Sequence, residues 1–227
     1  MIANKLKVLL GLSLISAACA SQAAVTTVPL TGMDADIRTW TDGSAYNPLY
    51  DSTQTLGGVS FSFAQDANRN TAIYNSPATL GTSIANASVV YTLVNSAFGA
   101  YGSDAGRITF YGSGGATYTY IYIEGLNIRD HYYGVFENST SSADVMQAVW
   151  GANSPGNAHL DMQTIVLPVA FNSQTLTSIV FDSSYAGGGG KAFLAGVSVA
   201  AVPEPGEYAM LLLGLGLMGA VARRRRG

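Results

Sequence analysis

A seven-residue stretch in the middle of the chain alternates strictly between two kinds of side chain. It reads TYTYIYI from Thr117 to Ile123, so three tyrosines fall on one face and threonine and isoleucine on the other. A period of two residues is the pattern of a β-strand, whereas an amphipathic helix repeats every 3.6 residues. The run VSFSF, which follows the Gly57-Gly58 turn signal, alternates in the same way at Val59–Phe63. Both runs therefore predict strands.

Other runs rich in β-branched and aromatic residues predict the remaining strands. Turn-forming clusters of Gly, Ser and Asn separate them, and outside the two chain ends no twelve-residue segment has a helical period. The predicted strands are Ile37–Trp40, Ser88–Val94, Arg107–Tyr111, Tyr132–Phe136, Val145–Trp150, Leu160–Leu167, Leu176–Phe181 and Phe193–Val202. Many short strands with frequent turns predict an all-β fold for residues 24–202, an antiparallel β-sandwich of jelly-roll-like type. No repeat of fixed length is visible, which argues against a propeller or solenoid.

The C-terminal end has three parts in a fixed order. Two prolines that keep the chain extended are followed by an uncharged, leucine-rich run from Tyr208 to Ala222, and then by four arginines. As a helix the run would span about 22 Å, which is short for a hydrocarbon core of ~30 Å. The arginines would stay on the cytoplasmic side. The sequence therefore predicts a hydrophobic helix that serves as a short membrane anchor at residues 203–227.

This order resembles the PEP-CTERM sorting signal. The matching elements are Pro203, Glu204 and Pro205, the Leu211–Gly219 run, and Arg223, Arg224, Arg225 and Arg226. The resemblance implies processing by an exosortase, a membrane-embedded cysteine transpeptidase of Gram-negative bacteria that make exopolysaccharide. It implies a transient inner-membrane anchor and then delivery to the cell surface or extracellular matrix. A plain tail anchor is the alternative, and the resemblance says nothing about the body of the chain.

The N-terminal end has the features of a secretory signal peptide. Lys5 and Lys7 precede an apolar run of eleven residues, Val8–Ala18, which is too short for a comfortable membrane span. Small residues follow, and they predict a signal helix over residues 1–23 with cleavage between Ala23 and Ala24. Cleavage after Ala20 is the second choice. The single cysteine of the chain lies within the predicted signal peptide, so the mature protein has neither a disulfide nor a thiol nucleophile.

The charge of the body separates it from the two ends. Residues 24–202 carry twelve acidic and five basic side chains, a net charge of −7. Such a domain has no electrostatic footprint for nucleic acid or for anionic lipid. At roughly 178 residues it is long enough for one sizeable core.

The alternating tyrosines are candidates for sugar binding. Tyr118, Tyr120 and Tyr122 lie on one strand face, where flat rings would stack on the C–H faces of pyranoses. The alternative is a half-buried sheet face, which aromatic residues favour in strands in any case.

The two histidines of the chain lie in its most polar segments. His131 ends the cluster NIRDH, and His159 lies two residues before Asp161. If the two segments met, they would supply ligands for a metal or an acid–base pair, but no spacing motif brings them together. We therefore expect no metal site and no catalytic site, and instead an ion pair between Arg129 and Asp130 that closes a loop.

Other oxygen-bearing side chains offer weaker candidates. An acidic segment holds Asp34, Asp36, Asp42, Asn47 and Asp51, whose oxygens suit Ca²⁺, although the EF-hand spacing is absent and solvated loop carboxylates are the default. A glycosidase would have Glu124, Asp130, Glu137, Asp144 and Asp161 to draw on, as would any acidic β-domain. We expect no cofactor.

Together these patterns predict an exported surface or biofilm-matrix protein. The predicted role is non-enzymatic, with exopolysaccharide and an exosortase as the expected partners. A secreted polysaccharide hydrolase or lyase is one alternative, and a structural adhesin without affinity for glycans is the other.

Overall fold

The computed structural model describes residues 24–183, 190–202, 214 and 218. Residues Val25–Val202 form a compact unit. Its strands are β1 (Val25–Val28), β2 (Ser52–Leu56), β3 (Val59–Phe63), β4 (Ala78–Ala85), β5 (Ala87–Ala97), β6 (Asp104–Gly112), β7 (Thr117–Ile123), β8 (Val145–Gly151), β9 (His159–Val166), β10 (Thr175–Asp182) and β11 (Lys191–Ala201). Three short 3₁₀ helices accompany them: η1 (Ile37–Thr39), η2 (Gly43–Leu49) and η3 (Val169–Ser173).

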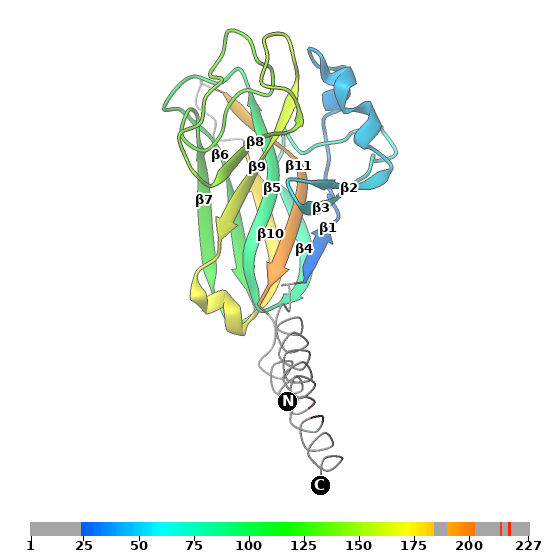
Figure 1. Ribbon diagram of the computed structural model, residues 1–227. Helices are drawn as coiled ribbons and strands as arrows, with labels where there is room; N and C mark the ends of the chain where they lie inside the picture. Colours follow the sequence, from blue (N-terminus) through cyan, green and yellow to red (C-terminus); the bar gives the residue numbers. More distant parts are fainter. Residues whose placement is uncertain (1–23, 184–189, 203–213, 215–217, 219–227) are drawn as a thin grey trace, which may run out of the picture. The chain divides into compact units, whose positions relative to one another are not determined.

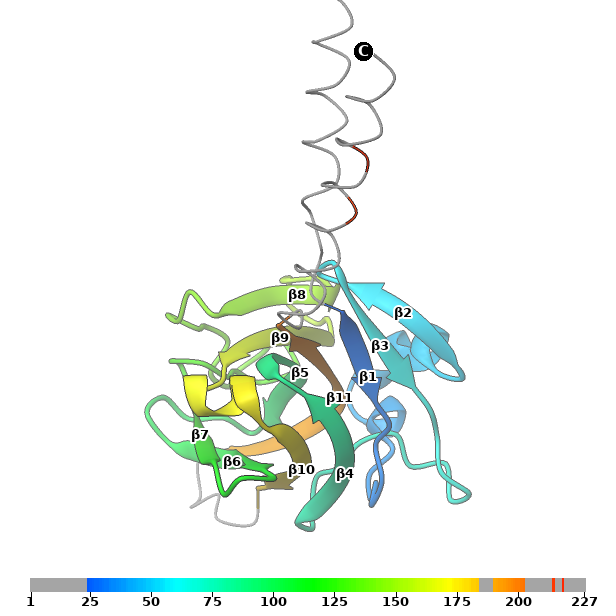
Figure 2. The same cartoon turned by 90° about the horizontal axis from the view of Figure 1, so that it is seen from below.

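The strands form two antiparallel sheets that pack face to face. The five-stranded sheet has the order β1-β11-β5-β9-β8 and the four-stranded sheet the order β4-β10-β6-β7, while β2 and β3 form a separate hairpin. Figure 2 shows the two layers end on, with the hairpin beside β1 and β11. The strands run along the domain, and the long loops gather at one end of it (Figure 1).

The main core lies between the two sheets. The five-stranded sheet contributes Val90 of β5 and Val197 of β11, and the four-stranded sheet contributes Phe110 of β6 and Phe181 of β10, all at most 1% exposed. Alternate residues along each strand face this core because successive side chains of a strand point to opposite sides. The alternation in the sequence therefore becomes a buried layer of the kind seen in β-sandwiches.

A second core covers the outer face of the five-stranded sheet. Leu93 and Phe193 of that sheet pack with Phe61 of the hairpin and with Ile37 and Tyr46 of the 3₁₀ segments, and all five are fully buried. The segment from η1 to β3 is therefore fixed to the sheet by apolar packing. This attachment places the end of η1 beside the loop end of the sandwich.

The structure confirms most of the predicted strands. Strands β3 and β7 have the predicted bounds, and β5, β6 and β8–β11 overlap their predicted ranges. Strands β1, β2 and β4 were not predicted.

Two predicted strands are wrong. Residues Ile37–Thr39 form η1 instead, with Trp40 as its C-terminal cap, because the side chain of Asp36 accepts the backbone N–H of Arg38 and caps a helical turn. Residues Tyr132–Phe136 form a loop that makes only an isolated bridge from Tyr132 to Ala158.

The prediction of an all-β, antiparallel two-sheet fold is confirmed. The jelly-roll-like connection stays a prediction, and the flanking helices predicted at the chain ends lie outside the described residues. Within the residues that the structure describes, no helix has the length and apolar character needed to cross a membrane.

Candidate functional site

A cavity of about 400 Å³ opens at the loop end of the sandwich. Four segments far apart in the sequence form it: the end of η1, the loop before β4, the end of β5, and the long connection from β7 to β8. The lining residues are Thr39, Trp40, Thr41, Tyr74, Ala97, Phe98, Asp130, His131, Tyr132 and Phe136. Six of the ten carry rings, and one is a carboxylate.

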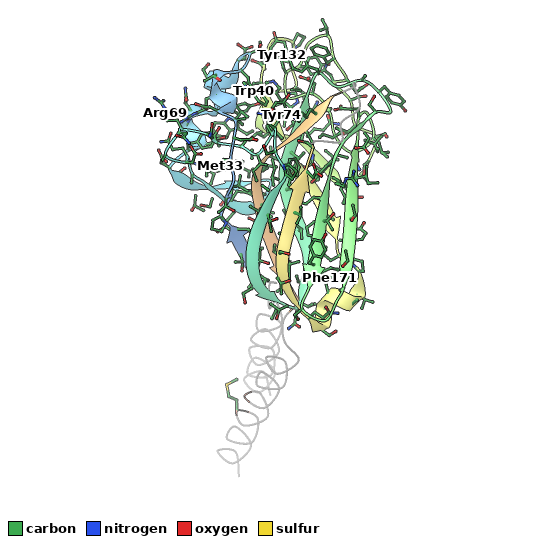
Figure 3. All side chains as sticks on the ribbon, turned by 180° about the vertical axis from the view of Figure 1, so that it is seen from behind. Met33, Trp40, Arg69, Tyr74, Tyr132 and Phe171 are labelled. Atoms are coloured by element: carbon green, nitrogen blue, oxygen red, sulfur yellow. The ribbon has the colours of Figure 1, made fainter. Side chains whose placement is uncertain are left out.

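The rings of the cavity pack edge to face rather than in a stack. Trp40 is central, with its ring centroid 4.9 Å from that of Tyr74 and 5.3 Å from that of His131. At the rim, Phe98 and Phe136 meet at 5.3 Å and 89°. Figure 3 shows that Trp40, Tyr74 and Tyr132 come from different segments and gather at the same end of the domain. Such edge-to-face arrangements are the geometry that the ring quadrupoles favour.

The rim residue Phe98 has an unusual backbone. Its φ of 65° lies in the left-handed region, which a bulky residue seldom adopts, and its side chain is 65% exposed. The backbone N–H of Phe98 donates to Oδ2 of Asp130 at 2.7 Å. This hydrogen bond holds the strained turn, and strain of this kind concentrates at functional sites.

Asp130 is the carboxylate of the cavity, and its orientation is fixed from both sides. Besides the bond from Phe98, its Oδ1 accepts the backbone N–H of Tyr132 at 2.7 Å. The residue is 2% exposed. Burial raises the pKa of Asp130, and the backbone hydrogen bonds oppose that rise by stabilising the charged form.

The predicted ion pair between Arg129 and Asp130 is wrong. Arg129 pairs instead with Asp161 of β9, with Nε 2.6 Å from Oδ2. Neighbouring side chains of an extended segment point to opposite sides, and Asp130 makes a parallel bridge with Ser96 in such a segment. Arg129 therefore points away from the cavity while Asp130 faces it.

The structure brings the two histidines together. The backbone N–H of His159 donates to the carbonyl of His131 at 2.9 Å. The hydroxyl of Tyr46 donates to the carbonyl of His159 at 2.9 Å and lies 3.3 Å from Nδ1 of His131. Burial lowers the pKa of His131 to about 4, with a further contribution from the nearby His159, so the imidazole is neutral at pH 7.

His159 is fully buried, and both of its ring nitrogens lack hydrogen-bond partners among the described residues. Across the described ranges, no three His, Cys, Asp or Glu side chains are arranged to hold a metal ion. Of the two histidines, only His131 lines the cavity.

The tyrosines of β7 do not form an exposed platform. Tyr122 is fully buried in the main core, and Tyr118 and Tyr120 are half-buried and pack against that core. The exposed face of β7 carries Thr119 and Ile121 instead. The prediction of sugar stacking on all three rings is therefore wrong for Tyr122, because its ring fills the space between the sheets.

The acidic segment near η1 uses its first two carboxylates internally. Asp34 accepts the backbone N–H groups of Tyr74, Asn75 and Ser76, which orients the loop that carries Tyr74 into the cavity wall. Asp36 pairs with Arg38 at 2.7 Å. Solvated carboxylates without a bound cofactor stay the prediction for this segment, and calcium binding stays its alternative. Of the five carboxylates considered for a glycosidase, Asp130 alone lines the cavity.

Sequence reasoning did not find the aromatic cavity. Trp40, Tyr74, Phe98 and Phe136 lie in four separated segments without a common period. A cavity between loops leaves no periodic signal because tertiary packing alone brings its residues together. The one local hint was the polar cluster that ends in His131, which contributes two lining residues.

One family model matches the chain, that of the PEP-CTERM protein-sorting motif, over residues 201–226. The match confirms the predicted sorting signal, and it implies export and processing by an exosortase, a membrane enzyme, for delivery to the cell surface. No curated protein matches the chain.

The motif residues Pro203–Pro205 and Arg223–Arg226, and the predicted signal peptide up to Ala23, lie outside the described residues. Ala24 is exposed and precedes β1 directly.

Proposed function

We propose that residues 24–202 are a non-enzymatic saccharide-binding domain, which holds an exosortase-sorted protein to exopolysaccharide at the cell surface or in the matrix. The observation that carries this proposal is the aromatic cavity at the loop end. Its volume of about 400 Å³ lies in the range of small-molecule sites, ~300–1,000 Å³.

The chemistry of the lining suits a sugar unit. Ring faces such as those of Trp40 and Tyr74 pack against C–H groups, while Thr39, Thr41 and Asp130 offer hydroxyl and carboxylate oxygens to sugar hydroxyls. Mostly apolar walls with a few fixed polar groups are typical of sites that bind small ligands. The fixed orientation of Asp130 limits the entropy lost when a ligand binds.

The position of the cavity supports a role at the surface. Strand β11 begins at Lys191, which pairs with Ala97 of the cavity, and it ends at Ala201, where the sorting motif begins. Eleven residues of strand span about 36 Å. The cavity therefore lies at the end of the domain opposite Ala201, the last residue of β11 (Figure 1).

A binding role is favoured over catalysis by the composition of the lining. Glycosidases need two carboxylic groups that flank the scissile bond, and the described lining offers Asp130 alone. His131 is a weak base because its pKa is lowered to about 4. A structural adhesin would not need an aromatic cavity.

Titration of the purified protein with the producer's own polysaccharide tests the proposal. Phe136→Ala is expected to weaken binding at least about fivefold, since a stacked aromatic ring contributes on the order of 1 kcal/mol. Trp40→Phe keeps a smaller ring and is expected to weaken binding less. The matched control is Tyr111→Ala on β6, because Tyr111 and Phe136 are both 40% exposed but Tyr111 lies outside the cavity.

The outcomes separate the three candidate functions. Binding that is weakened in the cavity variants and unchanged in Tyr111→Ala supports the proposal. Cleavage of the polysaccharide favours the hydrolase or lyase. If calorimetric titration shows no heat of binding with any glycan tried, the adhesin is favoured and the proposal is overturned.

A further inference from the structure

We propose that the cavity selects a sugar unit with a free ammonium group, such as a hexosamine, over its N-acetylated and uronic acid counterparts. The inference rests on the proposed saccharide-binding function and names the ligand class of that same cavity. It is carried by a buried carboxylate that lines the same cavity as several aromatic rings.

Asp130 supplies the carboxylate of the cavity. This carboxylate faces the cavity at 2% exposure and, among the described residues, forms no ion pair. Oδ2 accepts the backbone N–H of Phe98 and Oδ1 that of Tyr132, each at 2.7 Å, and the backbone N–H of Gly99 also stabilises the charged form. A carboxylate offers about four acceptor positions, so it can still accept from a ligand. A buried charge without a counter-ion is costly, and a cationic ligand would remove that cost.

Aromatic rings line the same cavity as this carboxylate. Trp40, Tyr74 and Tyr132 line the same cavity, and the faces of Trp and Tyr attract cations through the ring quadrupole. Within this molecule Tyr74 already receives one cation, since Nζ of Lys191 lies 5.0 Å from its ring centroid. Aromatic rings with a carboxylate form the kind of cage that holds ammonium groups.

Few positively charged side chains lie near the cavity to compete with a cationic ligand. Lys191 lies over the ring of Tyr74 but is not itself a lining residue, no arginine is among the described lining residues, and His131 is neutral at pH 7. The body has a net charge of −7, which attracts a cationic polymer and repels a uronate. A carboxylated sugar would also face Asp130 directly, and like charges disfavour each other in a buried site.

The test compares two oligomers that differ only in the acetylation of the amine, together with a uronate as a third ligand. Glucosamine and N-acetylglucosamine oligomers of equal length, and a galacturonate oligomer, are titrated into the purified protein below neutral pH, where the amine is charged. We expect the glucosamine oligomer to bind at least about tenfold more tightly than the acetylated one, from the sum of a cation–π contact and a charge-assisted hydrogen bond. The galacturonate should bind least.

Variants test the same point from the side of the protein. Asp130→Asn should abolish the preference for the free amine, whereas the exposed Asp144→Asn makes the same charge change outside the cavity and should preserve it. Because Asp130→Asn disturbs two backbone hydrogen bonds, Trp40→Phe is the second variant. It keeps an apolar ring but weakens the cation–π contact, so it should reduce the preference without a charge change.

The possible results distinguish this inference from the function on which it rests. Equal affinity for the free and acetylated oligomers overturns the ammonium preference and leaves the saccharide site standing. Tighter binding of galacturonate overturns the preference in the same way. Failure of every oligomer and of the native polysaccharide overturns both.

Discussion

Arg129 and Asp161 form a buried ion pair although they lie 32 residues apart in the sequence. Nε of Arg129 is 2.6 Å from Oδ2 of Asp161, Nη2 is 2.7 Å from Oδ1, and the two side chains are 1% and 0% exposed. Asp161 also accepts the backbone N–H of Ala148, at a residue of β8 with a φ of 50°. The pair thus ties the connection that carries Asp130 to the five-stranded sheet.

The first prediction concerns this pair. Arg129→Met or Asp161→Asn should each lower the free energy of unfolding by about 3–5 kcal/mol, because each leaves an uncompensated buried charge or unpaired polar groups. The double variant should lose less than the sum of the two single losses. Urea denaturation measures all three. Arg38→Met is the control, because the Arg38–Asp36 pair is more exposed, with side chains 10% and 20% exposed, and it should lose only about 1 kcal/mol. Equal losses of stability at the two pairs would contradict the conclusion that burial makes the Arg129–Asp161 pair the more important one.

The second prediction concerns the carboxyl group of Glu124. The residue is 1% exposed, neither oxygen has a hydrogen-bond partner among the described residues, and Gly99 and Gly190 pack directly against it. Burial raises the pKa of Glu124 to about 8 from an ordinary value of 4.5. The nearby Ser96 hydroxyl opposes this rise only in part, since it makes no hydrogen bond of normal geometry.

The sign of the pH effect follows from these two values. Between pH 4.5 and pH 8 the unfolded chain releases the proton of Glu124 while the folded chain keeps it, so stability falls as the pH rises, by up to about 1.4 kcal/mol per pH unit. Glu124→Gln should remove this decline and be more stable than the wild type at pH 8. Denaturant midpoints at pH 5 and pH 8 measure the difference. The same pH dependence in the variant and the wild type would exclude Glu124 as its source.

The third prediction concerns the strained backbone of Phe98. Phe98→Gly and Phe98→Ala both remove the ring from the cavity rim, so both should weaken saccharide binding to a similar extent. At a φ of 65°, however, alanine retains a steric cost that glycine lacks, and the glycine variant should be more stable by about 1 kcal/mol. Thermal unfolding measures this difference. At Val135, which is 92% exposed and has no positive φ, alanine should be more stable than glycine. If the Phe98→Gly variant is no more stable than the Phe98→Ala variant, backbone strain at this position is excluded.

The fourth prediction concerns the ends of the chain. Protein recovered from the cell surface or matrix should lack Met1–Ala23 and the arginines Arg223–Arg226. Export removes the signal peptide, and the sorting motif over residues 201–226 implies processing by an exosortase. Intact-mass spectrometry measures both cleavages. Replacing the four arginines by serine should release unprocessed protein into the periplasm or medium, because each arginine at mid-membrane costs ~2.5–3.5 kcal/mol and resists crossing. A surface form that keeps the arginines would identify the tail as an ordinary anchor.

The sequence alone determined the all-β class of the body, most of its strands and the sorting signal of the protein. Period-two alternation placed β3 and β7 at their observed bounds, since that pattern records local backbone geometry. The order of prolines, apolar run and arginines identified the sorting motif because each part is contiguous in the chain. Neither inference needed contacts between distant residues.

Only the tertiary structure decided which surfaces are available. The alternation in TYTYIYI defines two faces of β7 without saying which one is buried, and the packing of the opposite sheet placed Tyr122 inside and Ile121 outside. Tertiary structure also decided the partner of Arg129, which is Asp161 of β9 rather than its sequence neighbour Asp130. It likewise brought Trp40 and Phe136, from separate segments, into the lining of one cavity. Side-chain burial and loop convergence depend on the whole chain at once, so no local pattern encodes them.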